Sequence, residues 1–119
     1  MQRVKPINHY GKQLLLLDFS GARKEDFPVA LEEAEKSIRN QPLNSVLTLT
    51  DVSGARYNEE IVQTIKEFTK GNKPFVKAAA VVGLDGLKKI ICSTVMLFSQ
   101  RNLKAFDDIE KAKDWLSQQ

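Results

Sequence analysis

Short apolar segments of strand-like length alternate along the chain with longer segments whose apolar residues recur every three or four positions. The pattern predicts strands over residues 4–10, 13–19, 45–52, 75–82 and 103–106, and helices over about 24–40, 59–70, 87–100 and 108–117. Tyr10, Gly11 and Lys12 form a turn between the first two strands, which predicts a hairpin. Each of the last four strands precedes one helix, and successive units of about 30 residues require parallel strands with right-handed crossovers.

The alternation within the two central strands predicts how the sheet is covered. One set of side chains is aliphatic and the other is partly polar. The aliphatic set is Leu47, Leu49, Val76, Ala78, Ala80 and Val82, and the other set includes Thr48, Thr50 and Lys77. A parallel sheet covered on both faces is normally aliphatic throughout. We therefore expect most helices on one face, with the other face open or covered by a partner.

These elements predict a single α/β domain over residues 1–119. It begins with an N-terminal hairpin, continues as four consecutive βα units, and contains a mainly parallel five-stranded sheet. Asn58 is the expected N-cap of the second helix and Gly71 its expected terminator. Asp107 is the expected cap of the last helix, with Glu110 completing a pair that resembles a capping box.

One word of six residues occurs twice. Asp-Phe-Ser-Gly-Ala-Arg at 18–23 returns as Asp-Val-Ser-Gly-Ala-Arg at 51–56, each time between an expected strand and an expected helix. Both copies fall at the carboxyl ends of parallel strands, where open α/β sheets bind their ligands. The candidate binding residues are Asp18, Ser20, Arg23, Asp51, Ser53, Arg56 and Asn58.

Two interpretations of the repeated word stay open. In the first, it is a structural turn: Asp and Ser bond backbone amides, Gly supplies an unusual φ, and Arg pairs locally. In the second, a serine hydroxyl and a helix amino terminus hold a phosphate, a carboxylate or a protein partner. The second interpretation requires an arginine beside each of Asp18 and Asp51, because two carboxylates would otherwise repel an anion.

Composition indicates a soluble protein of a reducing compartment, which we expect to be cytoplasmic. The chain has one cysteine and so no intramolecular disulfide, and it lacks both a signal-like start and a membrane-length apolar stretch. The net charge of +3 is uneven: residues 1–60 carry 8 Lys/Arg and 9 Asp/Glu, whereas residues 61–119 carry 10 and 6. The bias favours an acidic partner or phosphate, although solvated lysines explain it too. No aromatics interleave these cations, which argues against a nucleic-acid partner.

The inventory of reactive residues argues against an enzyme, a metal site and a cofactor. Neither a phosphate-binding loop nor a dinucleotide fingerprint is present. His9 is the only histidine and lies beside the hairpin turn, where we expect a surface position. Without a second histidine or cysteine partner, His9 assembles neither a His/Cys metal site nor a Ser-His triad.

The expected helix over 87–100 carries a candidate interface. Cys92 and Met96 form an apolar pair near the side opposite its inner stripe, and Lys88 lies beside them. An exposed apolar pair of this kind indicates a homodimer or partner contact. Incomplete burial is the alternative.

The segments 16–21, 47–54 and 76–83 give the chain a resemblance to the STAS superfamily, the fold of bacterial anti-sigma-factor antagonists. More narrowly, the whole chain is similar to single-domain STAS/SEC14-type bacterial proteins. The resemblance implies a non-catalytic regulatory or protein-interaction module. Its alternative is a SEC14-type carrier of a small anionic or lipid-like ligand. The superfamily's phosphoacceptor segment matches residues 57–61, where the usual serine and glycine are absent.

Overall fold

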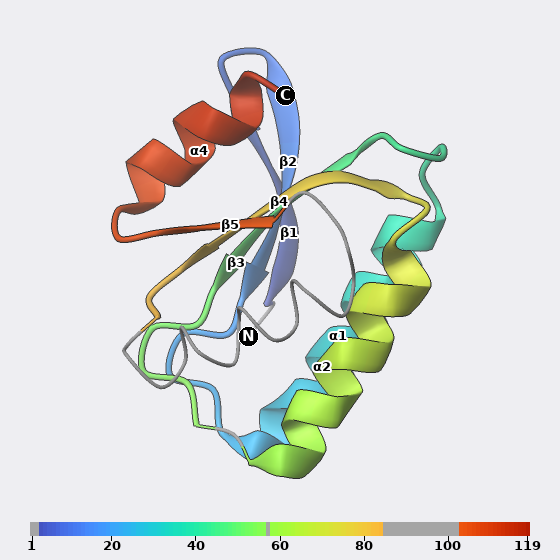
Figure 1. Cartoon of the computed structure of the whole chain (residues 1–119), viewed down its shortest axis with the longest axis vertical. Helices are drawn as coiled ribbons and strands as arrows, with labels where there is room; N and C mark the ends of the chain where they lie inside the picture. Colours follow the sequence, from blue (N-terminus) through green and yellow to red (C-terminus); the bar gives the residue numbers. More distant parts are fainter. Residues whose placement is uncertain (1–2, 57, 85–102) are drawn as a thin grey trace.

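A five-stranded sheet forms the centre of the molecule. The computed structural model describes residues 3–56, 58–84 and 103–119. The strands are β1 (Val4–His9), β2 (Lys12–Asp18), β3 (Val46–Asp51), β4 (Val76–Val82) and β5 (Leu103–Phe106), and they lie in the order β1-β2-β3-β4-β5 (Figure 1). β1 and β2 are antiparallel, and all later neighbours are parallel. The predicted hairpin and mainly parallel sheet are therefore confirmed.

The hairpin closes through a tight turn in which Tyr10 has φ 51° and Gly11 has φ 78°. Two successive positive φ values are typical of the type I′ turn, whose twist matches that of the flanking strands. The register pairs His9 with Lys12 and Val4 with Leu17. This register brings Val4 into the buried core beside Leu17.

Two helices cover one face of the sheet. A short 3-10 turn, η1 (Lys24–Asp26), leads into α1 (Phe27–Arg39), and α2 (Glu59–Asn72) packs alongside α1. The predicted inner residues of α1 are all buried: Phe27, Leu31, Ala34 and Ile38. Their spacing of three and four positions gives α1 one continuous apolar stripe toward the sheet.

The third described helix, α4 (Ile109–Ser117), lies on the opposite face (Figure 1). Its Ala112 and Leu116 are fully buried in a cluster with aliphatic residues of β2, β3 and β4. The prediction that most helices share one face holds for α1 and α2. The expectation that the partly polar face is open was wrong. Thr48 of that face is buried, and its partner in β4, Ala79, packs with Ile38 of α1. The two helices α1 and α2 therefore cover the partly polar face, and α4 covers the aliphatic face.

A β-bulge changes the alternation that the sequence predicted for β4. Val46 pairs with Val76, but the next residue, Leu47, pairs with Ala78, so Lys77 has no partner in β3. The extra residue turns Lys77 to the surface and puts Val76 on the opposite face from Ala78. The prediction that Val76 and Ala78 share one face was therefore wrong.

Two predicted helix ends also need correction. α2 does not stop at Gly71 but continues to Asn72, whose fully buried side chain accepts a hydrogen bond from Arg39 Nε at 3.3 Å. Gly71 lacks the positive φ of a C-terminal glycine, so it does not end α2. The cap of α4 is Asp108, one residue later than predicted, and it accepts from the Glu110 amide at 2.8 Å.

Candidate functional site

The two copies of the repeated word lie against each other at one end of the sheet. We call residues 18–23 and 51–56 the double corner. Asp18 and Asp51 are register partners in β2 and β3. Beyond the strands, the Gly21 amide donates to Ser53 O and the Arg56 amide donates to Ala22 O, both at 2.8 Å. The predicted meeting of the two copies at one end of the sheet is confirmed.

Each corner contains the same local hydrogen bonds donated by backbone amides, and in the first corner the Ser20 hydroxyl also donates to the Asp18 carboxylate. The amide two residues after each aspartate donates to its carboxylate, at 3.0 Å from Ser20 to Asp18 and 2.9 Å from Ser53 to Asp51. Each corner then closes a turn, from Ala22 N to Phe19 O and from Ala55 N to Val52 O, both at 3.0 Å. The word recurs because one backbone conformation is made twice. The structural interpretation of these aspartates is thus supported.

A third strand end supports the double corner. The Val52 amide donates to Val82 O at 3.0 Å, and Gly83 follows directly with φ 86°. A Cβ atom on Gly83 would lie 2.5 Å from Ser53 N and 2.7 Å from Ser53 Cα. Only glycine fits there. In the sequence, the position of Gly83 directly after a strand indicates a turn but not this close approach.

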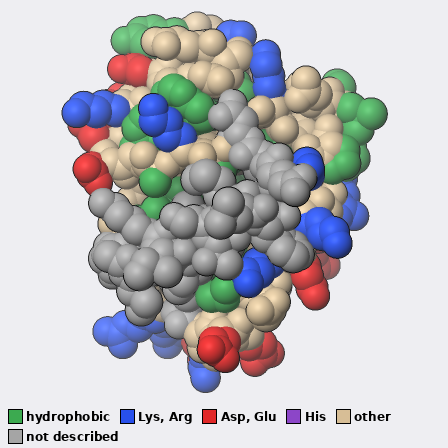
Figure 2. Space-filling view, viewed as in Figure 1, with side chains coloured by type: hydrophobic (Ala, Val, Ile, Leu, Met, Phe, Trp, Pro, Cys, Tyr) green, Lys and Arg blue, Asp and Glu red, His purple; other side chains and the backbone are tan. Residues whose placement is uncertain are grey.

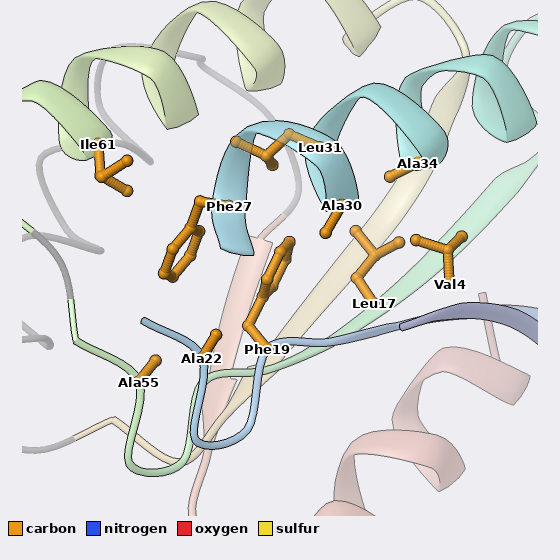
Figure 3. Packing of buried hydrophobic residues seen from close by; sticks show 10 residues of the cluster. All are labelled: Val4, Leu17, Phe19, Ala22, Phe27, Ala30, Leu31, Ala34, Ala55 and Ile61. Atoms are coloured by element: carbon orange, nitrogen blue, oxygen red, sulfur yellow. The ribbon is translucent and has the colours of Figure 1, made fainter. Parts of the chain in front are cut away.

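The alanines of the repeated word fix the double corner to the core. Ala22 and Ala55 are buried and lie on the side of the loops that faces Phe27 (Figure 3). Phe19 stacks on Phe27 with ring centroids 4.9 Å apart and planes 11° from parallel. A larger side chain at either alanine would meet this packed layer. The inner side of the double corner is therefore structural, and its outer side is what remains for recognition.

The arginines of the repeated word do not neutralise its aspartates, contrary to the requirement that we derived for anion binding. Arg3 approaches the first corner instead, donating from Nη1 to Asp18 O at 3.1 Å and to Ser20 O at 3.3 Å. The Arg23 side chain is 74% exposed and lies 4.0 Å from Asp26. Arg56 is also exposed. Both guanidinium groups are thus presented to solvent from a fixed backbone.

The amino terminus of α2 borders the double corner. Asn58 is its N-cap, as predicted, and its Oδ1 accepts from the Ile61 amide at 3.0 Å. This contact gives the Asn58 side chain a structural role. Glu59 and Glu60 occupy the first turn of α2, where negative charge complements the helix dipole.

Comparisons with known proteins agree with this fold. A family model described as SpoIIAA-like matches residues 6–117. The chain belongs to the SpoIIAA-like family. It is also similar to a solved structure from Shewanella loihica PV-4, an uncharacterized protein of the DUF3478 family with a SpoIIAA-like fold. That match has a TM-score of 0.77 at 16% identity, and covers 95% of this chain and 91% of the other. No curated protein matches the chain.

Other predicted features of this SpoIIAA-like chain are also placed. His9 is not a free surface residue: its Nε2 lies 2.7 Å from Asp114 Oδ1 and connects the hairpin to α4. Over residues 3–56, 58–84 and 103–119, no His/Cys/Asp/Glu group fits a metal ion, and no helix is long and apolar enough to cross a membrane. The candidate interface residues Lys88, Cys92 and Met96 lie outside the described residues.

Proposed function

We propose that this SpoIIAA-like chain is a non-catalytic interaction module that recognises a protein partner through the outer side of the double corner. One observation carries the proposal. The corners are joined by backbone hydrogen bonds between them, while Arg23, Ser53 and Arg56 are exposed. A fixed backbone with exposed polar side chains binds with little loss of conformational entropy.

The charges around the double corner favour a polypeptide over a simple anion. Arg23 and Arg56 are available to carboxylates of a partner, because Asp18 and Asp51 bond the serine amides of their own corners. Glu25, Glu59 and Glu60 are exposed nearby in sequence and add negative charge to the same part of the chain. A surface of both signs is complemented by a partner with both carboxylates and cations.

The STAS resemblance supports a binding role, since it implies regulation through partners rather than catalysis. Within this proposal the chain acts in the cytoplasm without the usual phosphoacceptor serine. Self-association through Lys88, Cys92 and Met96 stays a prediction, as does the alternative of a small-ligand carrier.

The test is a double substitution, Arg23→Ala with Arg56→Ala. Partners captured by the wild-type chain from extracts of its native host would first be identified by mass spectrometry and then titrated by calorimetry. Because arginines are frequent binding hot spots, we expect the double variant to bind at least about tenfold more weakly with an unchanged melting temperature.

Lys36→Ala is the matched control. Lys36 is 76% exposed on α1, and its substitution removes one cation outside the double corner. Equal affinity of the double variant and the control would contradict the proposal.

A further inference from the structure

The end of the sheet opposite the double corner brings three loops together. Since β2, β3 and β4 are parallel, the segments leading into them meet at one end. We call residues 10–13, 40–46 and 72–78 the loop end. The Asn44 amide donates to Pro74 O at 2.9 Å and the Ser45 amide to Phe75 O at 3.0 Å, which ties two of these loops together. A groove of 380 Å³, lined by Pro6, Gln13, Asn40, Pro42 and Ser45 among others, separates the hairpin from the α1–β3 loop.

Two large apolar side chains are exposed at the loop end. Tyr10 at the hairpin tip is 81% exposed, and Leu43 in the α1–β3 loop is 67% exposed. Figure 2 shows hydrophobic side chains at the upper edge and at the upper right, where Figure 1 places these two loops. The Tyr10 ring lies 4.4 Å from the ring of His9, which is itself bound to Asp114 of α4.

The three segments of the loop end carry positive charge only, since they contain Lys12, Lys73 and Lys77 and no Asp or Glu. One carboxylate lies beside them, that of Asp114, which contacts His9. All three lysines are exposed, and Lys77 is exposed because the β-bulge turns it out of the sheet. The double corner differs, since Glu25, Glu59 and Glu60 accompany its arginines. The two ends of the sheet therefore suit partners of different charge.

We propose that the loop end docks on the surface of an anionic lipid bilayer. Lysines near such a surface are attracted by its negative potential, and tyrosine and leucine on loop tips enter the interfacial layer. A tyrosine suits this layer because its ring is apolar and its hydroxyl is polar. A protein partner of stable affinity would bury a continuous patch of about 800 Å² on each side. The loop end instead offers apolar side chains on separate loop tips, with a groove between the loops.

The experiment is co-sedimentation of the full chain with vesicles. Phosphatidylcholine vesicles are compared with vesicles of phosphatidylcholine mixed with phosphatidylglycerol, at low and high salt. We expect binding to the mixed vesicles only, and weaker binding at high salt because salt screens the lysines. Lys73→Gln and Lys77→Gln should each reduce the partition coefficient about fivefold. Tyr10→Asn and Leu43→Ser should each reduce it about tenfold.

Matched controls come from elsewhere on the chain. Val29→Ser removes a side chain that is 70% exposed on α1, and Lys24→Gln removes a lysine beside the double corner. Neither should change the partition coefficient. Equal binding to both vesicle types, or equal effects of control and loop-end variants, would overturn the proposal. Binding to soluble poly-glutamate but not to vesicles would also overturn it, and would assign the loop end to an acidic protein.

Discussion

Among single residues, three glycines shape the double corner and the strand end beside it, because a side chain is unfavourable at each of their positions. Gly21, Gly54 and Gly83 all have positive φ, but their surroundings differ. A Cβ on Gly21 meets nothing within 4 Å, and one on Gly54 would make only ordinary contacts from 3.8 Å. A Cβ on Gly83 would enter the backbone of Ser53. The same residue type therefore has a conformational role at two positions and a steric role at the third.

Substitution of these glycines by alanine should separate the two roles. Gly21→Ala and Gly54→Ala should each lower the free energy of unfolding by about 1–2 kcal/mol, the usual cost of a left-handed conformation with a Cβ. Gly83→Ala should lower it by more than about 3 kcal/mol, because the corner must also move. Urea unfolding measures all three. Equal losses would mean that the close approach of Gly83 to Ser53 is not important for stability.

At the level of helices and strands, local signals of the sequence placed most ends of the described elements within one residue of their observed positions. Asn58 was predicted as a cap from its side chain alone, because capping involves only the next three residues. Gly71 was wrongly predicted as a terminator, because it stays helical instead of adopting the positive φ of a C-terminal glycine. The next residue, Asn72, is fully buried and accepts a hydrogen bond from Arg39 of α1, a contact that the local pattern does not record.

The cap of α2 is directly testable. Asn58→Ala removes the acceptor for the Ile61 amide and should destabilise the protein by about 1 kcal/mol in thermal or urea unfolding. Asn58→Asp keeps an acceptor and adds a negative charge at the positive end of the helix, so its stability should match that of the wild type or exceed it. A loss as large for Asp as for Ala would show that the amide nitrogen, not the cap oxygen, is the important group.

At the scale of the whole molecule, α4 decides how the second face of the sheet is covered. Its Leu116 is fully buried against the sheet, and its Asp114 contacts His9 of the hairpin. The last helix is therefore part of the same core as the first strands, although more than 100 residues separate His9 from Asp114 along the chain.

Truncation of Leu116 tests this docking. Leu116→Ala should lower the free energy of unfolding by about 2–5 kcal/mol, because it leaves a cavity in a fully buried position. Val29→Ala on α1 is the control and should change it by less than about 0.5 kcal/mol, since Val29 is 70% exposed. If both variants unfold at the same urea concentration, α4 contributes little to the stability of the sheet.

The hairpin, the parallel direction of the later strands, the inner face of α1 and the position of both corners at one end of the sheet could be predicted from the amino-acid sequence. These features follow from periodicity and turn chemistry, which act over a few residues and leave a readable pattern. Other features required the three-dimensional structure: the strand order, the hydrogen bond from Arg3 to the Asp18 carbonyl, the outward turn of Lys77, the contact of His9 with α4, and the position of three lysines at one end of the sheet. Each of these depends on contacts between segments far apart in the chain, and no local pattern records which distant segments will meet.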